Sequence, residues 1–462
     1  MKILAQDSEL KKYLNFSKLK RACEIVKSFK KQVLVVSHHD SDGLCAAAIV
    51  LKSLLRLGKM FHLKILKNPD KEMVKKLPTQ GLIIFTDIGL SFLKPLSQME
   101  NTVSIILDHH RVEEIETEGE NIIEISARSF SLDGTNGCCG STLAFLFALA
   151  LDERNSDLFP LALTGMIGDR QYINIQGLNH IILKSMTDGH SFVEKLDNRL
   201  NLCGETIENA LLTNTDPFFK GISGRKEAIR EYLKKIKVDG KRKLKELNEK
   251  ENAYLINLLS IHLLKAGATS STLKELCVTK FYVEIETEKG KMTLDLRDFS
   301  EVVDSCARKE EQELGVALAL GDFSEWERAV KHRECIRKKV MEGMITLESA
   351  RIRKRKAIQY FINPNPSISS PLCGLGMSYL LEKDKPTLVL SIKDDTVHVS
   401  ARATKELVSQ GLDLSKVMRM AARSAGGDGG GHDIASGASF PKSGMKKFLE
   451  EADRVTCEML GR

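Results

Sequence analysis

Acid and imidazole side chains follow three short apolar runs within the first 110 residues. The runs VLVVSHHDSD, LIIFTD and VSIILDHH cover residues 33–42, 82–87 and 103–110, and a fourth acid, Asp169, ends LALTGMIGD. Short runs rich in Val, Ile and Leu are typical of buried strands in a parallel sheet. In such sheets the chemistry collects where the carboxyl ends of the strands emerge. The pattern therefore predicts an α/β domain that carries a metal site at one sheet edge.

The residue types at this edge indicate which ions would bind. Carboxylates with one or two imidazoles suit manganese or magnesium, whereas structural zinc would call for thiolates, and the sequence has no CxxC pair. His38, Asp40 and Asp42 occupy alternate positions of one tight loop, so their side chains could converge. Asp87 ends what we expect to be a central strand and is the candidate for a shared ligand. Two cations roughly 3.5 to 4 Å apart can activate a water and neutralise a phosphate under attack.

A role in stability alone explains this cluster poorly. A single Asp at a strand end is more often a helix N-cap or a turn residue than a ligand. Several carboxylates packed together, however, repel one another and resist joint ionisation unless cations compensate them. We therefore interpret the acids and histidines as one functional site.

The motifs SHHDSDG, TD, LDHH and GD, in this order, resemble the four motifs of the DHH phosphoesterase superfamily. The resemblance implies two manganese ions, with magnesium as the other candidate. The ligands of the first would be His38, Asp40 and Asp87, and those of the second would be Asp42, Asp87, His109 and Asp169. It further implies that Asp108 orients His109, and that His110 faces the substrate phosphate as a polarising donor. His38 departs from bacterial RecJ-type members, which usually have Asp at this position.

Two stretches near the C-terminus, VHVSAR (397–402) and GGDGGGHDIASGAS (426–439), resemble the DHHA1 domain. Glycine runs let backbone N–H groups approach an anion, and Arg forms paired charge-assisted bonds with phosphate oxygens. The expected phosphate-binding residues are Ser400, Arg402, Gly430, Gly431 and His432, and Arg402 would also stabilise charge during the reaction. A third stretch, 139–150, is expected to be a helix entered through Gly140 and Ser141. Its amides would either bind phosphate or simply cap the helix.

Length and composition indicate a multidomain cytoplasmic protein. A chain of 462 residues predicts about three domains at ~150 residues each. Hydrophobic residues make up 42% of the chain, which is ample for packed cores. No apolar run approaches the ~18 to 20 residues that span a membrane, and the N-terminus lacks a signal-peptide core. The ten cysteines are scattered, apart from Cys138 and Cys139, which fits a reducing compartment.

Basic residues gather in two regions although the net charge is only +7. One region is 234–250, and the other comprises 331–339 and 351–356 on an expected long helix from 325 to 358. Such runs are either solvated helix faces or a path for a polyanion with salt-dependent, sequence-independent affinity. With one Trp and seven Tyr in the chain, we expect contacts to the nucleic-acid backbone to dominate over base stacking.

The resemblance covers nearly the whole chain and indicates the archaeal RecJ-like branch of the superfamily. It implies a parallel-sheet catalytic domain at 1–185, an inserted α+β domain at 186–324, a linker helix at 325–358 and a smaller α/β DHHA1 domain at 359–462. In this branch an inserted domain, related to that of the eukaryotic replication homologue, separates the two lobes. The implied activity is a metal-dependent exonuclease that releases mononucleotides from single-stranded DNA or RNA during replication or repair. The implied protein partner is the GINS complex, docked on the inserted domain.

Three alternatives stay open at this point. The first is another phosphoesterase of the same superfamily, which acts on short oligonucleotides, a cyclic dinucleotide or pyrophosphate. The second is a non-catalytic replication scaffold, although relatives of that kind have lost metal ligands and this chain retains the matched set. The third is a basic nucleic-acid-binding protein with a purely structural metal cluster, which predicts no hydrolysis.

Overall fold

The chain divides into two compact units. The computed structural model describes residues 16–67, 71–78, 80–110, 119–187, 192–288 and 290–462. The first unit comprises Met1–Asn198 and Val278–Arg333, and the second comprises Arg199–Cys277 and Glu334–Arg462. The chain therefore leaves the first unit after Asn198 and returns to it at Val278. Residues of the segment 186–324, which we expected to form one inserted domain, contribute to both units.

A five-stranded sheet organises the first unit. Its strands are β1 (Val33–His38), β2 (Phe61–Leu66), β3 (Gly81–Thr86), β4 (Thr102–Asp108) and β5 (Ile122–Ser126). They lie in the order β2-β1-β3-β4-β5, and every neighbouring pair is parallel. The predicted parallel sheet is therefore confirmed. Because β2 and β3 flank β1, the strand order reverses beside β1, and ligands of such sheets bind at the carboxyl ends of the strands at this switch point.

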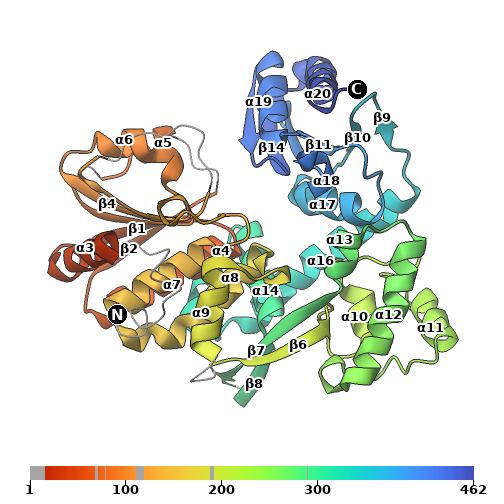
Figure 1. Ribbon diagram of the computed structural model, residues 1–462, viewed down its shortest axis with the longest axis horizontal. Helices are drawn as coiled ribbons and strands as arrows, with labels where there is room; N and C mark the ends of the chain where they lie inside the picture. Colours follow the sequence, from red (N-terminus) through yellow and green to blue (C-terminus); the bar gives the residue numbers. More distant parts are fainter. Residues whose placement is uncertain (1–15, 68–70, 79, 111–118, 188–191, 289) are drawn as a thin grey trace. The chain divides into compact units, whose positions relative to one another are not determined.

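Helices cover both faces of this sheet (Figure 1). The strands alternate their buried side chains, so that Val33 and Val35 join one apolar core while Val36 joins another. On the first face lie α3 (Phe16–Ser28), α4 (Ser41–Arg56), α7 (Gly140–Leu151) and α8 (Phe159–Gly168). On the second lie α5 (Lys71–Lys75) and α6 (Leu93–Ser97). All twelve residues of α7 are buried, which is why its sequence is apolar on every side.

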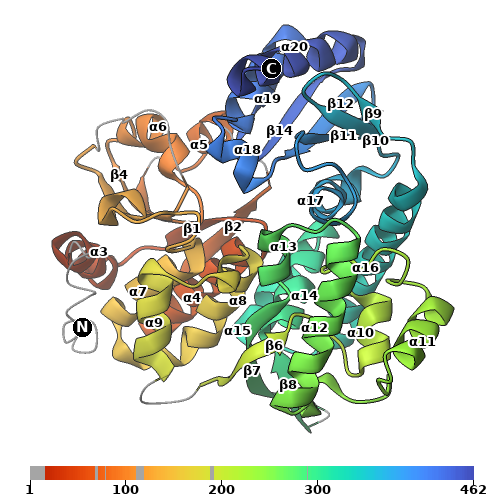
Figure 2. The same cartoon turned by 45° about the vertical axis from the view of Figure 1, so that its right-hand side comes forward.

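The returning segment completes the core of the first unit. After α9 (Gly177–Thr187), a three-stranded sheet with the order β6-β7-β8 is formed by β6 (Glu194–Leu200), β7 (Cys277–Thr287) and β8 (Gly290–Asp295). It is followed by α14 (Leu296–Arg308) and α15 (Gln312–Leu320). Figure 2 shows α14 and α15 beside α4 and α8, which they contact. Val302 and Val303 of α14 are fully buried in the same core as α4.

The second unit combines short helices with a mixed sheet. Its helices before Cys277 are α10 (Ile207–Thr213), α11 (Lys226–Lys235), α12 (Glu249–Lys265) and α13 (Ser270–Lys274). The sheet has the order β13-β14-β12-β11-β10-β9. Its strands are β9 (Arg353–Lys354), β10 (Gln359–Ile362), β11 (Thr387–Lys393), β12 (Thr396–Arg402), β13 (Asp428–Gly431) and β14 (Ala435–Pro441). The helices that accompany it are α17 (Ser369–Tyr379), α18 (Lys405–Ser409), α19 (Leu414–Ser424) and α20 (Met445–Leu460).

The expected linker helix is shorter than the sequence indicated. Helix α16 (Trp326–Ser349) begins in the first unit and continues into the second. It ends at Ser349, nine residues before the expected end at 358. Within the remaining stretch, Arg353–Lys354 forms the edge strand β9, which pairs with β10. A helix through the basic run 351–356 would place like charges three and four positions apart, which is unfavourable. In the strand, Lys354 pairs with Glu382 instead.

Within the described part of the chain, no helix has the length and apolar character needed to cross a bilayer.

Candidate metal centre and phosphate-binding residues

Eight acid and histidine side chains lie at the carboxyl edge of the parallel sheet. β1 ends at His38 and β4 ends at Asp108, while Asp87 follows β3 directly. The remaining members are Asp40 and Asp42 at the start of α4, His109 and His110 after β4, and Asp169 at the C-terminus of α8. The structure therefore brings together all six residues that were expected to bind metal.

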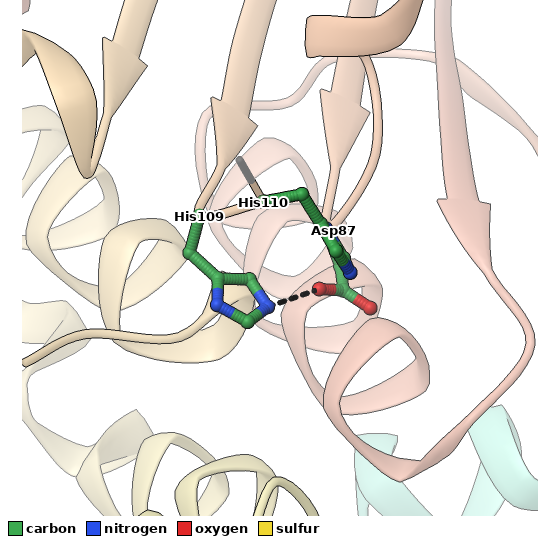
Figure 3. Close-up of side chains that lie close together, drawn as sticks. All are labelled: Asp87, His109 and His110. Atoms are coloured by element: carbon green, nitrogen blue, oxygen red, sulfur yellow. Dashed lines mark ion pairs between the residues drawn. The ribbon is translucent and has the colours of Figure 1, made fainter. Parts of the chain in front are cut away.

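Asp87 lies between two imidazoles. Its Oδ1 atom is 3.2 Å from Nε2 of His109, and its Oδ2 atom is 3.5 Å from Nδ1 of His38. Figure 3 shows the ring of His109 directed at this carboxylate. Nδ1 of His38 also lies 2.9 Å from Asp40, and Nε2 of His109 lies 3.3 Å from Asp169. The two oxygens of Asp87 thus face two different clusters, as a bridging ligand requires.

Three groups of candidate ligand atoms share members in this region. Within each group, every ligand atom lies within 4.8 Å of the others. The groups are His38, Asp40 and Asp87; Asp42, His109 and Asp169; and Asp87, His109 and His110. The first group has the residues of the first ion site that the resemblance implied. The second group has those of the other site except Asp87, whose Oδ1 atom lies 3.2 Å from Nε2 of His109 in that group.

The backbone at Asp87 adopts an unusual conformation. Its φ of 61° lies in the left-handed region, which Asp tolerates better than most residues and which is enriched at functional sites. Gly140 closes over it, because a Cβ at Gly140 would lie 2.6 Å from Cβ of Asp87. The same Cβ would lie 2.9 Å from Oδ2 of Asp42. Gly140 therefore allows the start of α7 to approach two of the candidate ligands.

The N-terminus of α7 holds Asp42. The amide of Gly140 donates to Oδ2 of Asp42 at 2.6 Å, and the amide of Ser141 donates to Oδ1 at 3.0 Å. The Ser141 side chain is fully buried, and its hydroxyl donates to the carbonyl of Ala162. The prediction that Ser141 contacts substrate was therefore wrong. The positive end of the helix dipole and its free amides are used by a carboxylate of the protein instead.

The carboxylates are electrostatically crowded. Burial raises the pKa of Asp42 well above its usual range, and the charges of Asp169 and Asp87 add to this rise. Burial raises the pKa of Asp169 to about 6, and Asp87 contributes to the rise although His109 opposes it. The acids therefore resist full ionisation together unless positive charge is supplied.

The pKa values of the imidazoles are also raised, which for these rings favours the charged form. Burial by itself lowers the pKa of His38, but the attraction of Asp40 and Asp87 outweighs it and raises this pKa to about 11. Burial is likewise outweighed at His109, where Asp169 and Asp87 raise the pKa well above its usual value. Protons on these rings compensate the acids, and a divalent cation would supply the same compensation.

Two buried ligand atoms lack a hydrogen bond. Among the described residues, neither Nδ1 of His38 nor Oδ1 of Asp87 makes one, although Nδ1 of His38 lies 2.9 Å from Asp40 and Oδ1 of Asp87 lies 3.2 Å from Nε2 of His109. Buried polar atoms are usually hydrogen-bonded, so each such exception needs a cause. A cation held by oxygen and imidazole ligands fits both atoms, and manganese or magnesium suits this donor set.

Asp108 orients His110 rather than His109. Its Oδ1 atom accepts from Nδ1 of His110 at 2.8 Å and from the His110 amide at 3.0 Å, while Oδ2 accepts from the amide of Leu90 at 2.9 Å. The expectation that Asp108 holds His109 was therefore wrong. His109 is fixed by the carbonyl of Gly134, which lies 2.6 Å from its Nδ1 atom. That contact leaves Nε2 of His109 directed at the acids.

The contact with Asp108 also keeps His110 charged. Burial lowers the pKa of His110, but the attraction of Asp108 outweighs it and raises this pKa to about 9. The Asp108 pKa is held below its usual value because the attraction of His110 outweighs the effect of burial. About a third of the His110 side chain is exposed. A charged, partly exposed ring beside the acid cluster has the properties of a donor to a phosphoryl oxygen.

The expected phosphate-binding residues of the second unit lie on neighbouring strands. Ser400 and Arg402 belong to β12, where they pair with Gly437 and Ala435 of β14. The Arg402 guanidinium donates to the hydroxyl of Ser370 at 3.0 Å and to the carbonyl of Ala401 at 2.9 Å. Ser370, at the start of α17, thus holds one side of Arg402.

Part of the glycine-rich run forms a strand. Gly430 and Gly431 belong to β13, the outermost strand of the sheet, and His432 follows in the turn to β14. Gly431 has a φ of 140°, and a Cβ there would lie 2.7 Å from the carbonyl of Ala435. In the part of the chain that the structure describes, β13 pairs with β14 alone. One edge of β13 is therefore not paired with any other described strand.

Three supporting residues were missed by reasoning from the sequence. Gly134 acts through its carbonyl, which no side-chain pattern reveals. Ser300 of α14 lies 2.8 Å, hydroxyl to hydroxyl, from Ser41, which stands between Asp40 and Asp42. The two serines are 259 positions apart, so only the fold brings them together. The third residue, His39, follows His38 in the first motif, and its Nδ1 atom lies 3.2 Å from Nε2 of His38.

Comparison with known proteins agrees with this arrangement. Residues 32–166 match the sequence profile of the DHH family, N-terminal domain, and residues 357–457 match that of the DHHA1 domain. The chain therefore contains a DHH domain and a DHHA1 domain. Its DHH domain supplies β1 to α8 and with them seven of the eight clustered side chains, while Asp169 lies three residues beyond the match. Its DHHA1 domain contains every residue of the second unit that was expected to bind phosphate.

A protein sequence and two solved structures are similar to this chain over most of its length. An uncharacterized protein of Methanocaldococcus jannaschii is 29% identical over 460 residues, which cover 96% of this chain and 99% of that protein. A crystal structure of exonuclease RecJ bound to manganese has a TM-score of 0.57 at 15% identity, covering 95% of this chain and 94% of the RecJ chain. A crystal structure of CDC45 from Entamoeba histolytica has a TM-score of 0.65 at 12% identity, covering 96% of this chain and 98% of the CDC45 chain. At these identities the two structures share the fold with this DHH protein.

Proposed function

We propose that this DHH protein is a two-metal phosphodiesterase that removes nucleotides from an end of single-stranded DNA or RNA. The observation that carries the proposal is Asp87, whose two carboxylate oxygens face His38 and His109 in two different ligand groups. A carboxylate in that position serves two cations. An acid or imidazole at every position of the matched ligand set supports this proposal further.

The proposed cofactors are two manganese ions, with magnesium as the alternative. Once bound, they would supply Lewis-acid stabilisation of the phosphate and activate a water for in-line attack. RecJ, which shares the fold, has been crystallised with manganese. The donor set of carboxylates and imidazoles is the support from this chain itself.

The protein side chains have separate proposed roles. Asp42, Asp169 and the other ligands hold the cations, and α7 holds Asp42 in place through its amides. His110, kept protonated by Asp108, donates to a phosphoryl oxygen and stabilises the charge that develops there. In the second unit, Arg402 and Ser400, with the edge of β13, are proposed to bind phosphate groups of the substrate.

Single-stranded nucleic acid is the proposed substrate because the fold is that of RecJ and because basic residues are concentrated outside the acid cluster. The run 234–250 holds eight Lys and Arg residues, and several of them, including Lys241 and Lys250, are exposed. Exposed cations along a surface bind a phosphate backbone without regard to sequence. We place this activity in DNA replication or repair in the cytoplasm.

A time course on end-labelled oligonucleotides tests the proposal. Single-stranded DNA and RNA would be labelled separately at each end and incubated with manganese or with EDTA. The proposal predicts manganese-dependent release of mononucleotides from one end, and the label that disappears first gives the polarity. Cleavage of di- or trinucleotides alone would instead identify a short-oligonucleotide phosphodiesterase.

The fold of CDC45 supports a second candidate role as a replication scaffold. We propose that the GINS complex binds this chain through the inserted segment. Tyr254, Ile261 and Leu264 of α12 support this, because they are 52%, 48% and 54% exposed although large and apolar. Co-purification of the wild type and of Ile261→Asp with GINS tests it. Equal recovery of the two proteins, or recovery of neither, would refute this docking surface.

A further inference from the structure

His39 directly contacts a candidate metal ligand but belongs to none of the ligand groups found among the described residues. Its Nδ1 atom lies 3.2 Å from Nε2 of His38, within hydrogen-bond geometry. The two rings meet edge to face, with centroids 4.7 Å apart and planes at 81°. His39 is partly buried, so this contact is only partly open to water.

The two nitrogens of His38 face different surroundings. Nδ1 points toward the carboxylates of Asp40 and Asp87, is buried, and makes no hydrogen bond to any described residue. Nδ1 is therefore the atom that would bind a cation. A neutral imidazole that binds through Nδ1 must carry its proton on Nε2. That proton needs an acceptor, and Nδ1 of His39 is the atom within reach.

His109 shows the same arrangement with a different acceptor. Its Nε2 atom faces Asp87 and Asp169, and its Nδ1 atom is 2.6 Å from the carbonyl of Gly134. Imidazoles that bind metal usually donate their outer N–H group to such a partner, which fixes both tautomer and ring orientation. For His109 the partner is backbone, which substitution does not remove. For His38 the partner is a side chain.

We propose that His39 is a positioning residue, which fixes the orientation and the Nε2–H tautomer of His38 so that Nδ1 is presented to a divalent cation. The inference rests on the proposed function, because it concerns the cation shared by His38, Asp40 and Asp87. It goes beyond that function by giving His39 a role in only one of the two ion sites. The site formed by Asp42, His109 and Asp169 does not depend on His39.

Two substitutions separate this role from simple packing. His39→Leu keeps an apolar side chain of similar reach but removes the acceptor. His39→Asn places an amide oxygen near the position of Nδ1 and so restores an acceptor. His62→Leu is the matched control, because His62 lies on β2, is exposed and belongs to none of the described ligand groups.

The test is a manganese titration of the full-length proteins by isothermal calorimetry, with electron paramagnetic resonance to detect spin-coupled ion pairs. The wild type and His62→Leu should bind two ions and show the coupled signal. His39→Leu should lose about 10- to 100-fold in affinity for one ion, which is the usual cost of removing such an outer partner, and should lose the coupled signal. Unchanged binding of its other ion would show that the variant is folded. His39→Asn should stay within about threefold of the wild type.

Two results would overturn the proposal. In one, His39→Leu binds both ions as the wild type does. In the other, His39→Leu and His39→Asn are weakened equally, which would make the ring itself, and not its acceptor, the cause. If the wild type binds no manganese at all, the proposed function fails together with this inference. If the wild type binds two ions and His39→Leu matches it, the inference about His39 fails alone.

Discussion

The crowded acids predict that one substitution will stabilise the protein without metal and weaken it with metal. The substitution is Asp169→Asn, which removes one negative charge from the cluster and keeps the shape of the side chain. Burial raises the pKa of Asp169 from 3.8 to about 6. Because the folded-state pKa is the higher one, ionisation destabilises the fold as pH rises from about 4 through 6, and the full cost is present above pH 6.

The size of this effect follows from the pKa shift. A difference of about 2 pKa units corresponds to ~3 kcal/mol at pH 8. The Asp169 side chain is 22% exposed, so solvent screens part of this energy, and we expect a net gain of about 1 to 2 kcal/mol for Asp169→Asn in EDTA. A gain of that size raises the unfolding midpoint by roughly 2 to 8 °C for a domain of 150 to 250 residues.

Manganese should reverse the order of stability. At an ion concentration 100 times the dissociation constant, binding stabilises the wild type by about 2.7 kcal/mol. The variant lacks one ligand and should gain less. The assay is thermal unfolding of both proteins at pH 8 with EDTA and with manganese, and again in EDTA near pH 4. The exposed Asp384→Asn serves as the charge-matched control.

Three results would refute this reasoning about Asp169. The variant could be no more stable than the wild type in EDTA at pH 8. Its advantage could persist undiminished near pH 4, where the Asp169 carboxyl is protonated in the folded protein. Asp384→Asn could give the same gain, which would assign the effect to net charge rather than to the cluster.

Three further substitutions probe other parts of the site. Asp87→Ala should reduce manganese-dependent hydrolysis to the level measured in EDTA while the far-ultraviolet circular dichroism stays unchanged, and retained activity would contradict the shared-ligand role. Arg402→Ala should lower kcat/KM on oligonucleotides about 10- to 100-fold, mainly through KM, because a charge-assisted hydrogen bond contributes about 1.5 to 3 kcal/mol. Manganese binding by this variant should be unchanged. An unchanged rate at low substrate would remove Arg402 from the site. Gly140→Ala should cost about 1 to 3 kcal/mol in unfolding experiments, because its Cβ would lie 2.6 Å from Asp87, and wild-type stability would contradict this close approach.

The parallel sheet and the clustering of the acids could be predicted from the sequence. Apolar runs of strand length each ended in an acid or imidazole, and the carboxyl ends of parallel strands meet at one edge. Asp87 was expected on a central strand, and β3 is the middle strand of the five. The apolar character of a strand and the type of residue at its end are local properties, so the sequence carries them directly.

The partners of individual side chains could not be predicted in the same way. A helix N-terminus binds an anion, but the sequence does not say whether this is a substrate phosphate or, as at α7, the carboxylate of Asp42. Asp108 could reach either histidine that follows it, and the choice of His110 depends on backbone geometry after β4. The contact of Ser300 with Ser41 depends on the return of the chain to the first unit at Val278.

Secondary structure was least predictable where charge and glycine dominate. The basic run 351–356 continues a helical pattern, but repulsion between its cations and the pairing of β9 with β10 end α16 at Ser349. The glycines at 429–431 have weak preferences of their own, and their pairing with β14 makes them a strand. In both places contacts distant in sequence outweigh local preference.

The central claim is that Asp87 bridges two cations. Anomalous diffraction from crystals grown with manganese, recorded at the manganese absorption edge, tests it most directly. The account predicts two anomalous peaks roughly 3.5 to 4 Å apart, one beside each oxygen of Asp87, with His38 and Asp40 at one peak and Asp42, His109 and Asp169 at the other. A single peak, or two peaks that do not both contact Asp87, would contradict it.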